Sequence, residues 1–126
     1  TASEIDTAIA NLAQLGVGAL QVAQDAFFNT ERERLVRLAA RYKLPAIYGV
    51  RSFAESGGLI SYATDFAAGF HQGGIYVGKI LKGGKLAELP VLQSTKFELV
   101  INLKTAKALG LTIPSGVMAI ADEVIE

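Results

Sequence analysis

The chain has 126 residues, which is enough for one compact domain with a hydrophobic core of its own. Its twelve basic and twelve acidic residues cancel, so it lacks the excess of Lys and Arg that binding to nucleic acid or to an anionic membrane surface requires. The absence of cysteine excludes disulfides and thiolate metal sites.

The hydrophobic fraction of 51% is high for a chain in which no stretch of about 18 consecutive apolar residues could form a membrane span. A parallel sheet whose strands are buried on both faces accounts for such a composition. We therefore predict an α/β fold: a three-layer α/β/α arrangement around a mainly parallel sheet.

The first half of the chain alternates helices and strands. It opens directly into a helix pattern without an initiator methionine, which is typical of an excised part of a longer protein. The tetrapeptide from Thr30 to Glu33 matches a capping box and should open the second helix. The predicted elements are a helix from residue 3 to about 15, a strand over 18–22, a loop over 23–29, a helix over 30–42 and a strand over 46–50.

The second half continues with shorter elements. Asp65 can cap a helix over 66–81, although glycines within it cost up to ~1 kcal/mol each relative to alanine. The remaining predictions are a loop over 51–58, strands over 59–62, near 91–94 and over 98–102, and helices over 105–109 and 115–125.

The sequence motifs give little support for a catalytic function. His71, the only histidine, falls in the middle of a predicted helix, and no GxSxG elbow accompanies it. The sequence Gly83-Gly84-Lys85 follows a helix, whereas phosphate-binding glycine loops precede one. We predict a protein that is not an enzyme and that carries no metal or cofactor.

The loops that follow the predicted strands hold the best candidates for a binding site. In open α/β sheets, ligands bind at the carboxyl ends of the strands. An acid, an arginine, hydroxyl groups and aromatic rings at this edge would suit a small zwitterionic ligand with an apolar side chain. The competing interpretation is that the aromatic residues are ordinary core residues. The candidates are Gln24, Asp25, Phe27, Tyr48, Arg51, Ser61 and Tyr62.

Four stretches also resemble a known family. They are LPAIY at 44–48, ESGGLISY at 55–62, KILKG at 79–83 and KFELVINLKTAKALGLTIP at 96–114. Together they resemble the C-terminal part of bacterial ABC-transporter substrate-binding proteins, in the group that includes binders of tryptophan and other aromatic amino acids. The last stretch is the most specific.

This resemblance implies a lobe of the type I periplasmic-binding-protein fold. Family members are longer and close two lobes over a ligand, so residues 1–126 would form a C-terminal lobe, with about 63–83 belonging to the other lobe. It further implies a periplasmic or extracytoplasmic protein that captures an amino acid or related carboxylate by hinge closure and delivers it to an ABC permease. A lone fragment would expose its lobe-facing surface and self-associate.

The family role also suggests tasks for the candidate residues. Gln24 and Asp25 would bind the ligand amine or hydroxyl groups, Tyr48 and Tyr62 would pack on its side chain, and Arg51 and Ser61 would face a carboxylate. The alternative is a stand-alone flavodoxin-like regulatory or interaction module. Such a module should carry an acidic cluster after its first strand, which Asp25 alone matches poorly.

Overall fold

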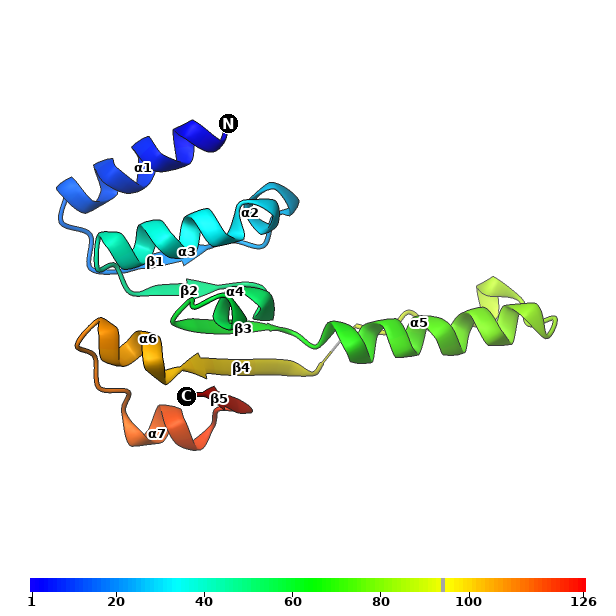
Figure 1. Cartoon of the computed structure of the whole chain (residues 1–126). Helices are drawn as coiled ribbons and strands as arrows, with labels where there is room; N and C mark the ends of the chain where they lie inside the picture. Colours follow the sequence, from blue (N-terminus) through cyan, green and yellow to red (C-terminus); the bar gives the residue numbers. More distant parts are fainter. Residues whose placement is uncertain (94) are drawn as a thin grey trace. The chain divides into compact units, whose positions relative to one another are not determined.

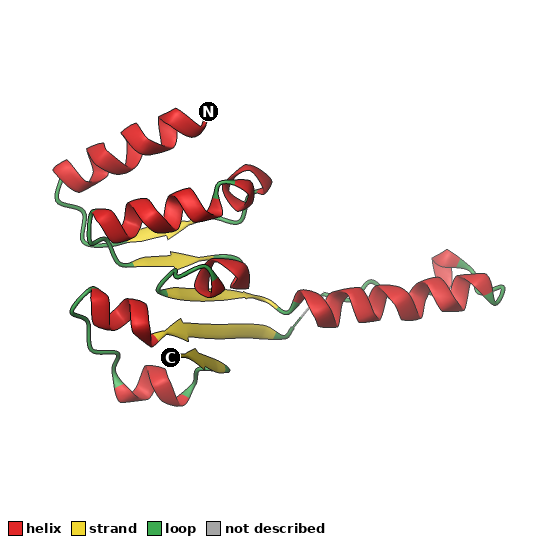
Figure 2. Cartoon of the chain, in the orientation of Figure 1, coloured by secondary structure: helices red, strands yellow, loops and turns green. Residues whose placement is uncertain are grey.

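The computed structural model describes residues 1–93 and 95–126, which form two compact units: residues 1–63 with 98–126, and residues 64–97. Helices connect successive strands along the chain (Figure 2). The strands are β1 (Leu20–Val22), β2 (Ala46–Tyr48), β3 (Ile60–Thr64), β4 (Phe97–Asn102) and β5 (Glu123–Ile125). The helices of the first unit are α1 (Ala2–Gln14), α2 (Ala26–Thr30), α3 (Arg32–Arg41), α4 (Arg51–Glu55), α6 (Leu103–Ala108) and α7 (Ser115–Ala119).

The strands form one sheet in the order β1-β2-β3-β4-β5 (Figure 1). β1 pairs with β2, β2 with β3, and β4 with β5, all in parallel. β4 runs antiparallel to β3: the Asn102 amide at the end of β4 donates to the Leu59 carbonyl just before β3, and the Asp65 amide just after β3 donates to the Lys96 carbonyl just before β4. The predicted mainly parallel α/β sheet is thus confirmed.

The core of the first unit lies between β2 and the helices α1, α3 and α4. Along β2, Ala46 and Tyr48 are buried, whereas Ile47 between them is 39% exposed. The Tyr48 ring stacks on that of Phe53 in α4, with ring centroids 4.6 Å apart. α1 and α3 lie side by side (Figure 1) and cover this face of the sheet. Their buried apolar residues are Ile5, Ile9, Leu35, Val36, Leu38 and Ala39.

A buried asparagine joins β4 to the helices around it. The Asn102 side chain accepts a hydrogen bond from the Thr105 amide at 3.0 Å and so caps α6. Its amide nitrogen donates to the carbonyl of Ala54 in α4, 3.1 Å away. Since a buried polar group needs hydrogen-bond partners, these two contacts account for an asparagine that is only 5% exposed.

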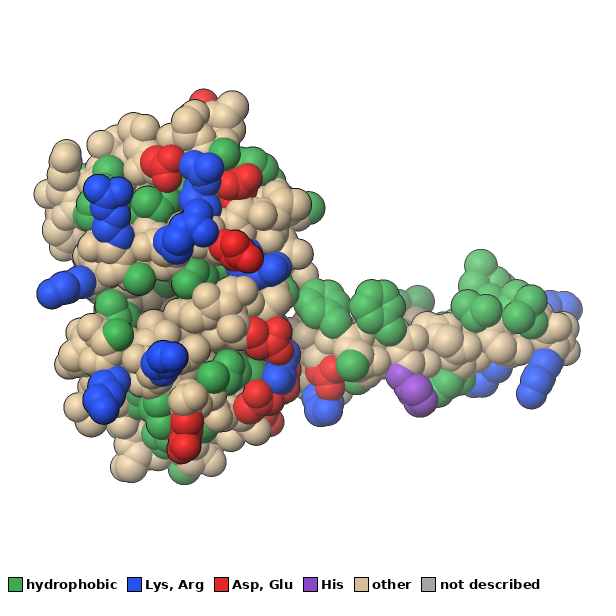
Figure 3. All heavy atoms as spheres, viewed as in Figure 1, with side chains coloured by type: hydrophobic (Ala, Val, Ile, Leu, Met, Phe, Trp, Pro, Cys, Tyr) green, Lys and Arg blue, Asp and Glu red, His purple; other side chains and the backbone are tan. Residues whose placement is uncertain are grey.

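The second unit consists of α5 (Phe66–Leu81), the short 3-10 helix η1 (Leu86–Glu88) and their connections. Asp65 caps α5 by accepting from the Ala68 amide at 3.0 Å, so the predicted helix is confirmed at both ends. None of its described residues is buried, and Figure 3 shows hydrophobic side chains standing along it. Phe70 and Leu81 are 79% and 81% exposed. No helix among the described residues is long and apolar enough to span a bilayer.

Two predicted loops are wrong because each contains a short helix. Asp25 accepts a hydrogen bond from the Phe27 amide and caps α2 in the predicted loop over 23–29. Thr30 is the last residue of α2, where its hydroxyl donates to the Phe27 carbonyl at 2.7 Å, and α3 begins after Glu31 without a side-chain cap, so the predicted capping box is not formed. α4 occupies the second loop, where its first residue, Arg51, ion-pairs with Glu55 one turn later.

The C-terminal prediction is also partly wrong, because α7 ends at Ala119 and is followed by β5. The Leu99 amide donates to an Asp122 carboxylate oxygen at 2.8 Å, and this contact helps to align β5 with β4. Residues 91–93 form no strand, and Ser94, the end of that predicted strand, lies outside the described residues.

One residue at the end of α3 predicts a stabilising substitution. Lys43 has φ 53°, a left-handed conformation that costs a non-glycine residue about 1 kcal/mol. We expect Lys43→Gly to raise the free energy of unfolding by about 0.5–1 kcal/mol, measured by urea unfolding. The matched control is Lys104→Gly within α6, which should lower it by up to about 1 kcal/mol. A loss in Lys43→Gly as large as in the control would contradict this expectation.

Candidate functional site

An open hollow lies at the carboxyl ends of β1 and β2 in the first unit. Its volume is about 300 Å³, at the lower limit of the range typical of small-molecule sites. Gln21 and Ile47 stand next to each other on neighbouring strands, and both face away from the helix-covered side of the sheet. The lining residues are Gln21, Val22, Ala23, Gln24, Ile47, Tyr48, Gly49 and Tyr62.

Glycine at position 49 allows two walls of the hollow to lie close together. A Cβ atom at this position would lie 3.2 Å from both the Cβ and the backbone nitrogen of Gln24. Such contacts are tighter than ordinary van der Waals contacts, so glycine allows the loops after β1 and β2 to approach each other. The position of Gln24 therefore depends on the absence of a side chain at residue 49.

Three of the predicted site residues line this hollow: Gln24, Tyr48 and Tyr62. Gln24 is exposed, and Tyr62 is 54% exposed on the open face of the sheet.

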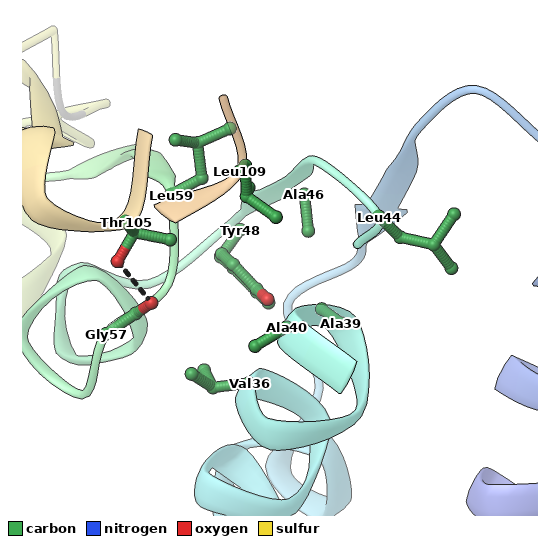
Figure 4. A pocket seen from close by; sticks show the side chains of 10 residues that line it. All are labelled: Val36, Ala39, Ala40, Leu44, Ala46, Tyr48, Gly57, Leu59, Thr105 and Leu109. Atoms are coloured by element: carbon green, nitrogen blue, oxygen red, sulfur yellow. Dashed lines mark hydrogen bonds between the residues drawn. The ribbon is translucent and has the colours of Figure 1, made fainter. Parts of the chain in front are cut away.

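Tyr48 is only 2% exposed, and its ring lies mainly in the core. Figure 4 shows this ring beside Val36 and Ala40 of α3, around a second cavity of about 10 Å³. That cavity is about the size of one water molecule and is too small for a solute. Burial raises the pKa of the Tyr48 phenol to about 12.

Asp25 and Phe27 follow Gln24 closely in the chain, but they do not belong to the lining of the hollow. The Asp25 carboxylate accepts a hydrogen bond from the Phe27 amide at 2.8 Å, which occupies one of its oxygens in capping α2. Phe27 is 40% exposed, and its ring contacts that of Phe28 with centroids 5.9 Å apart.

The Arg51 guanidinium is engaged by three carboxylates. It contacts Glu55 at 2.7 Å, Glu98 at 2.5 Å and Glu123 at 2.6 Å. Hydrogen bonds to Glu55 and Glu123 raise the pKa of Arg51, so the group stays charged at any physiological pH. The structure thus places this side chain on acidic partners from α4, β4 and β5.

Ser61 is fully buried in β3, directly beside Tyr48 in the register of the sheet. Its hydroxyl oxygen has no hydrogen-bond partner among the described residues. Ser61 and Tyr48 share a face of the sheet, because residues in register on parallel strands point the same way. That face is the one covered by helices, whereas Tyr62 points to the open face.

The chemistry that this hollow offers is neutral. Its lining residues carry no charge; Gln21 and Gln24 provide amide donors and acceptors, and Ile47 and the Tyr62 ring provide apolar surface. Such a wall suits the uncharged body of a small solute. Within the described residues, no group of three or more His, Asp or Glu side chains could hold a metal ion.

The sequence did not identify Gln21, Ile47 and Gly49 as site residues. The three residues of β2 are all apolar, so no alternation in the sequence signals that Ile47 alone faces away from the core. The close contact of Gly49 with Gln24 joins two loops that are 25 residues apart in the chain, and no local pattern signals it.

Comparisons with known proteins give a consistent result. The family model described as ABC transporter substrate binding protein matches residues 1–125. A crystal structure of a conserved domain protein from Vibrio cholerae is 27% identical, with a TM-score of 0.87 over 98% of this chain and 42% of its own. No curated protein matches the sequence.

Two further solved structures are similar. The ABC domain from Streptococcus pneumoniae, solved in complex with L-Trp, is 30% identical, with a TM-score of 0.86 over 99% of this chain and 43% of its own. The ligand-free, open structure of a Clostridium difficile substrate binding protein with adhesive properties is 24% identical, with a TM-score of 0.71 over 99% of this chain and 41% of its own. The chain thus spans less than half the length of each of these structures.

Proposed function

This chain belongs to the family of ABC transporter substrate binding proteins, and on that basis we propose that it forms part of the solute-binding component of an ABC importer. The whole protein captures a small solute outside the cytoplasmic membrane and delivers it to a membrane permease. It acts by binding and release, without catalysis. The observation that carries this proposal is the family match over nearly the whole chain, together with an open hollow at the sheet edge where α/β proteins bind ligands.

We propose an amino acid as the solute, with an apolar or aromatic side chain. The relative from Streptococcus pneumoniae was solved with L-Trp, which supports this class of ligand. The side chain of the solute packs on Ile47 and Tyr62, and the amide of Gln24 binds one of its polar groups. Since the hollow is lined by uncharged residues, groups outside its lining bind the ligand's charges.

The surface of the second unit supports a larger, two-lobed protein that closes on its ligand by a hinge. α5 leaves Phe66, Phe70 and Leu81 exposed, although apolar side chains in such numbers are normally covered. The similar structures are longer than this chain. We propose that residues 64–97 pack on the other lobe of the whole protein, a longer segment than the 63–83 expected from the sequence.

The outer strand β1 also supports the proposal that the whole protein is larger. β1 is an outer strand, and beside it lies a groove of about 200 Å³ lined by Ile5, Ile9, Leu12 and Phe28 among others. The open edge of an outer strand next to an apolar groove is a place where further chain can add to the sheet. We propose that the rest of the lobe docks there.

A fluorescence titration tests the binding function. The chain contains no tryptophan, so added L-tryptophan is the only indole in solution. We expect the fluorescence anisotropy of L-tryptophan to rise on titration with the protein. We expect Tyr62→Ala and Gln24→Ala to weaken binding about 3- to 10-fold each, because each removes one contact with the ligand. Gln14→Ala, an exposed amide on α1, is the matched control and should bind as the wild type does.

Two outcomes would contradict the proposal. One is an unchanged anisotropy for L-tryptophan combined with no heat-stability shift for any other proteinogenic amino acid. The other is binding that Tyr62→Ala and Gln24→Ala leave unchanged, which would place the ligand away from the hollow.

A further inference from the structure

Arg51 occupies a junction of elements that are far apart in the sequence. It is the first residue of α4 and follows β2 after two intervening residues. Its carboxylate partners are Glu55 in the same helix, Glu98 near the start of β4 and Glu123 at the start of β5. Because β4 and β5 run opposite to β2 and β3, the first residues of β4 and β5 lie at the end of the sheet where β2 and β3 finish.

The charges at this junction do not cancel. One guanidinium serves three carboxylates whose side chains are 50%, 27% and 44% exposed for Glu55, Glu98 and Glu123 respectively. Without the guanidinium these carboxylates would repel one another, and repulsion between partly buried charges is screened less than repulsion in bulk water. Arg51 pairs with all three of these carboxylates and so offsets part of their repulsion.

Arg51 is also close in the sequence to residues that line the hollow. Gly49, which packs on Gln24, lies two residues before Arg51, and Val50 between them is the N-cap of α4. Any displacement of the first turn of α4 would move Gly49 and, through it, the wall formed by Gln24. The Phe53 amide donates to the Val50 carbonyl at 3.2 Å, which makes this turn measurable by amide exchange.

We propose that Arg51 is a positioning residue that fixes the first turn of α4, and with it the Gly49–Gln24 wall, by neutralising Glu98 and Glu123 on the neighbouring strands. This inference rests on the proposed function insofar as that wall binds a solute. It assigns Arg51 to the protein's own carboxylates in place of a ligand carboxylate.

Amide hydrogen exchange, followed by NMR on the whole chain, tests the inference without any ligand. We expect Arg51→Gln to speed exchange at Phe53 and Ser56 by about tenfold or more, which corresponds to about 1.4 kcal/mol of local stability. The Leu35 amide, which donates to the Glu31 carbonyl at 3.0 Å in α3, should keep its wild-type rate. Arg51→Lys, which retains the charge, should be less affected than Arg51→Gln.

Charge rescue distinguishes positioning by neutralisation from lost packing. We expect the triple variant Arg51→Gln, Glu98→Gln, Glu123→Gln to return the Phe53 rate most of the way to that of the wild type. High salt should do the same for Arg51→Gln, because at about 1 M the Debye length falls to about 3 Å. A wild-type Phe53 rate in Arg51→Gln, an equal acceleration at Leu35, or a triple variant as fast as Arg51→Gln would each overturn the inference.

The ligand titration is read separately. Where the wild type binds L-tryptophan, Arg51→Gln should weaken binding and the triple variant should restore it. A wild type that binds no amino acid would contradict the proposed function, whereas the exchange rates would still decide the role of Arg51.

Discussion

Replacing Tyr48 with alanine is expected to lower the free energy of unfolding by about 3–5 kcal/mol. The ring is 2% exposed, stacks on Phe53 and contributes to the cluster that α1, α3 and α4 form over the sheet. Its removal would leave a cavity in the centre of that cluster. Because domains of this size are typically stable by only about 5–15 kcal/mol, a large part of the total would be lost. Urea unfolding followed by far-UV circular dichroism measures the change.

Tyr48→Phe is the matched variant, since it keeps the ring and removes only the hydroxyl. Because the buried ring and its stacking on Phe53 are kept, we expect this variant to be as stable as the wild type at neutral pH. A large loss in Tyr48→Phe would show that the hydroxyl is bound and would contradict the packing role.

The two variants also predict a difference in alkaline solution. Burial raises the pKa of Tyr48 to about 12, whereas tyrosine in an unfolded chain titrates near pH 10. Below about pH 10 the phenol is neutral in both states, and its contribution to stability is fully present. Between about pH 10 and 12 the unfolded chain loses the proton first, so the wild type should lose about 2–3 kcal/mol that Tyr48→Phe retains. Equal losses in both proteins would contradict the raised pKa.

Gly58→Ala is expected to lower the free energy of unfolding by about 2–4 kcal/mol. A Cβ atom at this position would lie 2.6 Å from Cε2 of Tyr48 and 2.8 Å from the carbonyl oxygen of Phe53. The second contact is with backbone, and the Gly58 amide donates to that same oxygen at 2.7 Å, so the turn cannot open without losing this bond.

Gly116→Ala is the matched control for this substitution. Nothing lies within 4 Å of a Cβ atom at Gly116 in α7, so the same change should leave stability unchanged or raise it by a few tenths of a kcal/mol. Thermal unfolding of both variants measures the effect. A Gly58→Ala variant as stable as Gly116→Ala would contradict the close approach of residue 58 to the Tyr48 ring.

Local signals predicted the long elements well. Asp65 before α5 and the glycine pair after it placed both helix ends correctly, because capping involves residues only a few positions apart. The short helices α2 and α4 were missed, because five residues are too few to show helical periodicity. β5 was predicted as helix, since its strand conformation depends on pairing with β4, more than twenty residues earlier.

The candidate site, like the fold, was predicted only in part from the sequence. The sequence indicated Gln24 and Tyr62 as candidates in loops after strands; both line the hollow, but Tyr62 lies within β3 and not in a loop after it. The face of the sheet that each side chain occupies depends on strand pairing and on where the helices pack. Tyr48 and Ser61 point to the face of the sheet that the helices cover, whereas Tyr62 points to the open face. The sequence had led us to predict that all three contact one ligand.

The family and the α/β class were accessible from the sequence alone, because both depend on patterns of neighbouring residues along most of the chain. The ion pairs of Arg51, in contrast, follow from contacts that form only in the folded chain. A cation after a strand suits a ligand carboxylate as well as it suits one of the protein's own, and its partners Glu98 and Glu123 are 47 and 72 residues away in the chain. The sequence shows that a residue is charged. Which residue it pairs with depends on which strands the fold brings together at one end of the sheet.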